Sequence, residues 1–458
     1  MKLILHTIIN VFILILFCNC THEEQYDLII ENSNLLNVNT GQILKNRSIL
    51  IKNGIIEKIV GSSKEYKAVK KIDAKGKLVT PSFIDTHTHP MSVFGDNDEA
   101  PKYLKNDSIN YFRKELTDTY LPYGVTTILM LGHPETWLPP ILKWQKEKSP
   151  QHTDIYTSGA ALISDEQDEP YIGHIELKSP EEAREKVIAY YNSGIRTIKI
   201  YFNLRKPEFI EVMKTADSLN MNVFGHIGDY SPNRISIQEA LGFGLKNFEH
   251  IPTLPFSVLK GDDWEKVLHE FMVFYGKPDT KEKTMMIPLE LFRYIDKYRK
   301  DNMISLIDKL SKAHASVSTS IGIIYRNAVS MNNLKANSKV FTSEQIQRNE
   351  ENFTIMMKYI KLMLSKNITL RIGTDTEDGG KIFLFEMYLL SEHGISMEDI
   401  FKIATINGAK IMRINKEVGS MEIGKSANLI IWDKNPFLKS MYLFDSKTVI
   451  KNGNVYIN

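Results

Sequence analysis

Cysteine is scarce in this sequence: Cys18 and Cys20 are its only two among 458 residues, and both lie near the N-terminus. The rest of the chain therefore has no disulfide framework and no thiolate metal site. A surplus of one charge is also lacking, since 57 basic residues stand against 55 acidic ones and the formal net charge is +2. This balance provides no positive electrostatic potential that would attract nucleic acid, so we exclude nucleic acid as a partner. Any metal ion must be held by histidine, carboxylate or a modified lysine.

Long apolar runs are scarce as well, and the most prominent, LILHTIINVFILILFCNC, occupies residues 3–20. A lysine precedes it and the polar THEEQ follows directly, so it is shorter than a membrane-spanning helix needs. The pattern resembles a bacterial lipoprotein signal peptide over residues 1–20. That resemblance implies a lipid on Cys20, contact with a membrane through this lipid, and a lipid-anchored or secreted protein of a bacterial cell envelope. Plain secretion, an uncleaved anchor and a buried N-terminal helix are the alternatives.

Both ends of the remaining chain are rich in β-forming residues. ILIKNGIIEKIV at 49–60 places two apolar runs around Asn53-Gly54, a strong hairpin signal. NLIIWD and VIKNGNVYI repeat this style near the C-terminus. Neither segment is large enough to close a core alone, so we predict one small composite β-sandwich domain from residues 26–80 and 416–458.

Strands alternate with amphipathic helices between these ends. Ser179-Pro180-Glu181-Glu182 is a good helix start, with a capping side chain, an early proline and acids at the positive end of the helix dipole. Eight strands are predicted: the one carrying FIDTHTH, then GVTTILML, TDIYTSG, GIRTIKIYF, NVFGHIG, KNFEHI, ASVSTSIG and TLRIGTD. Eight such units predict an α/β fold, a distorted (β/α)8 TIM-like barrel over residues 81–415.

The range of about 255–350 is longer than one crossover needs and is rich in charge and helix formers. We interpret it as a helical insertion over the barrel mouth. It would act as a lid, or as a decorative or dimer-forming helical pair.

Two histidines end the apolar strand in FIDTHTHP. Because side chains alternate faces along a strand, His87 and His89 would point the same way and Thr88 the other. Two imidazoles could then share one ion. An H-x-H pair also occurs at ordinary strand ends, so the rest of the chain must decide.

Further polar side chains fall at or beside the ends of other predicted strands: Lys199, His226, His250 and Asp375. In a parallel barrel these ends meet at one rim. Each residue has an ordinary alternative: the lysine can reach the outer surface, the histidines can be hydrogen-bonded core residues, and the aspartate can cap a loop. The same coincidence would be needed on five strands, which favours one shared site.

PSFIDTHTH at 81–89 and ATINGAKIMRINKEVGSMEIGKSANLIIWDKNP at 404–436 resemble the amidohydrolase superfamily of metal-dependent hydrolases in its two-metal form. The resemblance extends from about residue 26 to the C-terminus. It implies two divalent ions, with zinc as the expected metal, and a carboxylated lysine that bridges them. The ligands implied are His87, His89 and Asp375 for one ion, His226 and His250 for the other, and Lys199 as the bridge.

The chemistry of such a ligand set is direct. Neutral imidazoles and hard oxygens suit zinc or similar ions. An ammonium cannot ligate, but a lysine enclosed in an apolar barrel loses its proton more easily, and carbon dioxide can convert it to a bidentate anion. Two ions about 3.5–4 Å apart share a water and lower its pKa toward neutrality.

The implied activity is hydrolysis of a carbon–nitrogen bond in an amide, dipeptide or cyclic amide, with Asp375 as both ligand and catalytic base. GVTTILMLG and EKVIAYYNSGIRTIKIYF look most like a branch that contains imidazolonepropionase-like enzymes and Xaa-Pro carboxydipeptidases. We expect His133, just after the second strand, in the substrate pocket, although a loop histidine bonded to backbone is the alternative. Esters, lactones and phosphotriesters also remain open as substrates.

Two other functions stay open. A one-metal deaminase of the superfamily would have no use for a bridging lysine, so Lys199 counts against it. A catalytically inactive surface binding protein would show lost ligands, and none is lost here. The sequence leaves open whether the chain forms a homo-oligomer.

Overall fold

The computed structural model describes residues 25–63, 65–89, 108–164, 173–228, 235–328, 340–376 and 378–456. The predicted signal peptide, with Cys18 and Cys20, lies outside these residues. In the part of the chain that the structure describes, no helix combines the length and the apolar character needed to cross a membrane.

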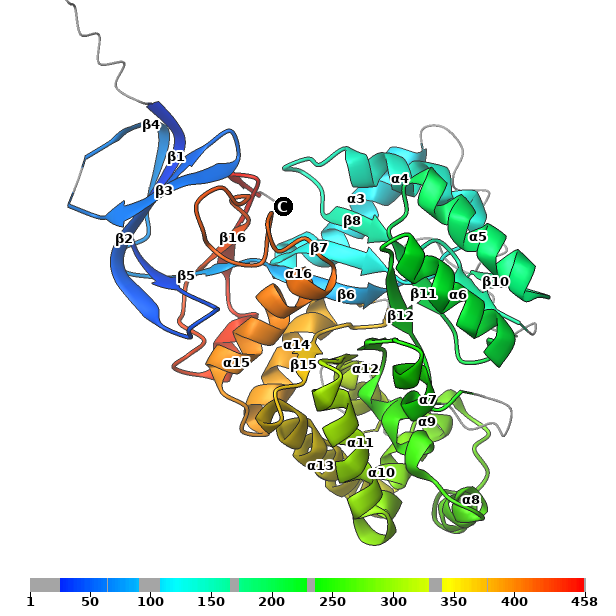
Figure 1. The fold of residues 1–458 in the computed structure, drawn as a ribbon. Coiled ribbons are helices and arrows are strands. Elements are labelled where there is room, and N and C mark those ends of the chain that lie inside the picture. Colours follow the sequence, from blue (N-terminus) through cyan, green and yellow to red (C-terminus); the bar gives the residue numbers. More distant parts are fainter. Residues whose placement is uncertain are drawn as a thin grey trace, which may run out of the picture.

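Both ends of the described chain build one mixed sheet, visible in blue and red on one side of the molecule (Figure 1). β5 runs antiparallel to β16, with Leu429 opposite Pro81, and this pairing joins the two ends. The hairpin predicted at Asn53-Gly54 is present between β2 and β3, and both turn residues have positive φ (51° and 75°), as such a turn requires. The strands are β1 (Gln25–Leu36), β2 (Ile43–Lys52), β3 (Ile55–Gly61), β4 (Lys67–Asp73), β5 (Leu78–Pro81), β16 (Leu429–Trp432), β17 (Lys447–Lys451) and β18 (Asn454–Val455).

Parallel strands form the centre of the molecule in two sheets, ordered β6-β7-β8 and β10-β9-β11-β12-β13-β14-β15. The backbone N–H of Thr86 in β6 donates to the carbonyl of Ile372 just after β15 at 3.0 Å, so the first and last strands are neighbours. The strands are β6 (Phe83–Thr88), β7 (Val125–Met130), β8 (Asp154–Thr157), β9 (Ala161–Ile163), β10 (His174–Glu176), β11 (Thr197–Ile200), β12 (Asn222–Gly225), β13 (Asn247–Phe248), β14 (Ser316–Ser318) and β15 (Thr369–Arg371). The predicted fold class, a TIM-like barrel with a terminal β-sandwich, is confirmed.

Helices surround these strands (Figure 1). The helix predicted after Ser179 begins there: the Ser179 hydroxyl accepts the backbone N–H of Glu182, and Gly194 ends the helix in the left-handed conformation. The helices are α3 (Ser108–Tyr120), α4 (Leu138–Lys146), α5 (Pro180–Ser193), α6 (Lys206–Ser218), α7 (Ile237–Gly242), α8 (Asp263–Tyr275), α9 (Lys281–Thr284), α10 (Ile287–Tyr298), α11 (Lys300–Lys312), α12 (Ile321–Ala328), α13 (Ser343–Ser365), α14 (Gly380–Glu392), α15 (Met397–Lys402) and α16 (Gly408–Ile411).

The structure adds detail that the strand pattern did not predict. β9 and β10 are strands of three residues each, and β9 pairs with both β10 and β11 in the barrel wall. Helices α8 to α11 lie between β13 and β14, and α12 and α13 lie between β14 and β15. The range of about 255–350 contains barrel strand β14, at the predicted strand ASVSTSIG, as well as helices. Its role as a lid and the exact domain limits stay predictions.

Candidate metal centre

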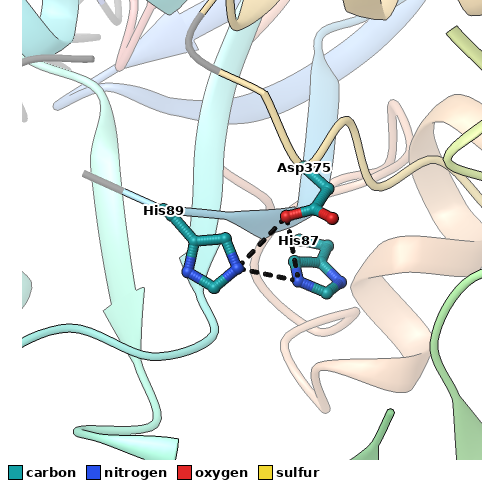
Figure 2. Close-up of side chains that lie close together, drawn as sticks. All are labelled: His87, His89 and Asp375. Atoms are coloured by element: carbon teal, nitrogen blue, oxygen red, sulfur yellow. Dashed lines mark hydrogen bonds and ion pairs between the residues drawn. The ribbon is translucent and has the colours of Figure 1, made fainter. Parts of the chain in front are cut away.

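Strand β6 delivers two histidines to the rim of the barrel. All six of its residues are buried, and the alternation along the strand turns His87 and His89 to the same side. Their Nε2 atoms lie 3.2 Å apart (Figure 2). If both atoms face one metal ion, neither needs to carry a proton. The Nδ1 atom of His89 lies 3.1 Å from the carbonyl oxygen of Gly132, which can only accept, so Nδ1 carries the proton and Nε2 is free to ligate.

Asp375 reaches the same point from beyond the end of β15. Its Oδ1 lies 3.1 Å from Nε2 of His89 and 3.5 Å from Nε2 of His87 (Figure 2). Asp375 has a φ of 50°, a left-handed conformation that costs a non-glycine residue about 1–2 kcal/mol. Its backbone N–H donates to the carbonyl of His87 at 2.9 Å, which holds the turn. Ligand atoms of the three residues all lie within 4.8 Å of one another, as a shared metal ion requires.

A second pair of imidazoles adjoins this group. Nε2 of His250 lies 3.7 Å from Oδ2 of Asp375, and its ring centroid lies 4.6 Å from that of His87 and 4.7 Å from that of His226. Nδ1 of His250 contacts the Ser320 hydroxyl at 3.0 Å, which directs Nε2 toward Asp375. His250 also has a positive φ of 61°. The two left-handed residues, His250 and Asp375, thus face each other across the site.

Lys199 lies in β11, which pairs with β12, and its side chain is 1% exposed. Burial lowers the pKa of its amine to about 8, although Glu249 and Asp375 oppose the shift. Nζ has no hydrogen-bond partner among the described residues. A buried amine without a partner is costly, and a carboxylated lysine bound to metal ions would remove that cost. Burial and an unpartnered amine are thus compatible with the predicted bridging role of Lys199, which stays a prediction.

His133 lies just after β7 and is fully buried. Its Nδ1 donates to the carbonyl of Pro134 at 2.9 Å, and its Nε2 lies 2.6 Å from the hydroxyl of Thr157. Burial lowers its pKa to about 4, so the ring is neutral at pH 7. Both nitrogens have protein partners, as in the alternative of a structural loop histidine, and contact with substrate stays a prediction.

Several residues of the site were not singled out by sequence reasoning. Asp85 accepts hydrogen bonds from the hydroxyl (2.6 Å) and backbone N–H (3.1 Å) of Thr374 and from the backbone N–H of His87 (3.1 Å), and burial raises its pKa to about 7. It ties β6 to the turn that carries Asp375. The signal was available, since an aspartate inside the apolar FIDTH is expected to have partners.

Glu249 and Arg371 were also missed. Both are fully buried, and they form an ion pair beneath His87. Burial alone would raise the pKa of Glu249, but Arg371 and His87 hold it well below its usual range. Their signal was a charged residue inside each of the apolar strands NFEHI and TLRIG.

The arrangement defines a class of protein: a parallel barrel with a His-His-Asp metal site at the carboxyl ends of its strands. The chain matches the amidohydrolase family over residues 78–456 and belongs to that family. Imidazolonepropionase of Picrophilus torridus is 24% identical over 417 residues, which cover 89% of this chain and 91% of the relative.

Two further proteins are similar to most of this chain. The 5'-deoxyadenosine deaminase of Methanobrevibacter smithii is 24% identical over 416 residues, which cover 85% of this chain and 80% of that protein. A crystal structure of a Xaa-Pro dipeptidase with methionine in its active site superposes with a TM-score of 0.62 at 18% identity. It covers 94% of this chain and all of that one.

Proposed function

We propose that the protein hydrolyses the carbon–nitrogen bond of an amide, with a dipeptide or cyclic amide as substrate, at two divalent ions held by the six predicted ligands. Zinc is the proposed metal and carboxylated Lys199 the proposed bridge. The observation that carries this proposal is the meeting of Asp375 with His87, His89 and His250 at the rim of the barrel. The fit of buried, unpartnered Lys199 supports it.

Bound ions would supply an activated water and polarise the scissile carbonyl. Asp375 would take the proton of that water and transfer it to the leaving nitrogen. Its side chain is 28% exposed, whereas His87 beside it is 1% exposed, so a substrate can reach the aspartate from solvent. The neighbouring imidazoles would stay as neutral ligands, because burial lowers the pKa of His87 to about 4 and that of His250 well below its usual value.

The substrate class rests on the fold likeness to a Xaa-Pro dipeptidase and on the sequence branch. A deaminase is the second candidate, favoured by the match to 5'-deoxyadenosine deaminase. An inactive surface protein is the third, and a retained ligand set counts against it. We also propose a location in a bacterial cell envelope, with a lipid on Cys20 as the membrane contact.

A panel of dipeptides, N-acyl amino acids and cyclic amides, assayed with zinc-loaded protein, tests the activity. Asp375→Asn should lower kcat by a hundredfold or more while KM changes little, because the base is lost and most substrate contacts remain. Asp296→Asn is a matched control, since Asp296 has a similar exposure of 25% and pairs with Lys358 between helices α10 and α13. Equal turnover in wild type and Asp375→Asn would contradict the proposal.

A further inference from the structure

A carboxylate, Glu249, lies directly behind one ligand of the candidate metal centre. Its Oε2 is 2.6 Å from Nδ1 of His87, and both side chains are at most 1% exposed. A carboxylate at this point can only accept, so Nδ1 of His87 must carry the proton. The lone pair of His87 is then on Nε2, the atom that faces His89 and Asp375.

Arg371 holds the other oxygen of this carboxylate. Its Nη2 donates to Oε1 of Glu249, and neither side chain is exposed. The rest of the guanidinium is fixed too: Nη1 donates to the Thr86 hydroxyl at 2.8 Å, and Nη2 to the carbonyl of Phe248 at 3.2 Å. Arg371 therefore connects β15 with Thr86 in β6 and with Phe248 in β13, next to Glu249.

An ion pair of this kind is not explained by stability alone. Removing two charges from water costs several kcal/mol, and apolar side chains of the same volume often do as well. Glu249 and Arg371 are nonetheless buried in the barrel as an ion pair. The Glu249 carboxylate of this pair contacts His87, a proposed metal ligand. Because the pair is neutral overall, it can polarise His87 without changing the net charge of the metal centre.

Neighbouring ligands have weaker partners. Nδ1 of His89 faces the carbonyl of Gly132 at 3.1 Å, and Nδ1 of His250 faces the hydroxyl of Ser320 at 3.0 Å. A carboxylate makes a stronger, charge-assisted hydrogen bond than either. Of these three histidines, His87 is therefore the one whose orientation and basicity are most strongly set by its hydrogen-bond partner.

We infer that Glu249 and Arg371 are positioning residues that fix His87 with its proton on Nδ1 and its Nε2 aimed at the metal. The inference rests on the proposed metal site. Binding of the ion held by His87, His89 and Asp375 would then depend on two side chains that do not contact the ion.

The test is zinc affinity, measured by competition with a chromophoric chelator on purified metal-free protein. Glu249→Gln should weaken binding of the first ion by about 10–100-fold, the usual effect of losing a partner behind a metal ligand. The matched control is Glu290→Gln, which also removes a buried carboxylate. Glu290 in α10 accepts a hydrogen bond from Nε of Arg348 in α13 at 2.8 Å. This substitution should reduce stability but leave zinc affinity unchanged.

Arg371→Lys is the second variant, in case Glu249→Gln does not fold. It keeps the buried positive charge but not the fork that fixes Glu249, so it should weaken zinc binding less than Glu249→Gln, by several-fold. Wild-type zinc affinity in either folded variant overturns the inference and leaves the proposed function standing. A wild-type protein that binds no zinc overturns both.

Discussion

Asp375 and His87 are joined twice. The backbone N–H of Asp375 donates to the carbonyl of His87 at 2.9 Å, and Oδ1 of Asp375 lies 3.5 Å from Nε2 of the same histidine. The backbone hydrogen bond holds Asp375 in its left-handed conformation. That conformation brings its carboxylate close to the His87 ring. The first and last strands of the barrel thus meet at the point where the metal site forms.

Metal binding should stabilise the protein, because the ligands are assembled only in the folded chain. With free zinc at about 1,000 times its dissociation constant, the gain in the free energy of unfolding should be about 4 kcal/mol. Urea denaturation of metal-free protein, with and without added zinc, measures it. Coincident curves would show that no such site exists. Magnesium, which prefers oxygen ligands, serves as the control ion.

Lys199→Met should make the metal-free protein more stable at neutral pH, because it removes a buried amine that has no hydrogen-bond partner. The pKa of Lys199 is about 8 in the folded state and about 10.5 in the unfolded state. The unfolded chain therefore binds the extra proton between these values, and the stability of the wild type should rise as pH rises from about 8 to 10.5.

This rise should be absent from Lys199→Met. Denaturant titrations of the two metal-free proteins at several pH values isolate the effect as the difference between them. If both proteins show the same dependence above pH 8, Lys199 does not titrate in this range.

Thr374→Val should destabilise the turn that carries Asp375. Asp85 loses a hydroxyl donor at 2.6 Å while it stays buried, which should cost about 1–3 kcal/mol. Turnover should fall as well, because the same turn places the proposed base. Thr405→Val is the control, since its hydroxyl donates to the carbonyl of Phe401, four residues earlier in the chain. Denaturation and kinetics should separate the two variants. A turnover loss of equal size in both would argue against the role of Asp85.

The sequence predicted well what depends on periodicity. Alternation along β6 placed His87 and His89 on one side, and Asn53-Gly54 marked its hairpin, because both follow from local geometry. Contacts between distant segments were harder. The positive φ of Asp375 depends on a backbone bond to His87 in another strand. The Glu249–Arg371 pair likewise joins two segments that are distant in sequence, and no local rule predicts which buried charges will meet.

Some very short strands were also not predicted from the sequence. β9 has only three residues, Ala161–Ile163, and its pairing with β11 comes from the neighbouring barrel strands rather than from its own pattern. A run of this length is too brief to show a period.

The number of metal ions bound per chain tests the central claim most directly. Elemental analysis of zinc-loaded, desalted protein should find about two ions in the wild type and fewer in Lys199→Met, which lacks the proposed bridge. One ion in the wild type, unchanged by that substitution, would favour a deaminase-type site. No bound ion in the wild type would contradict the account as a whole.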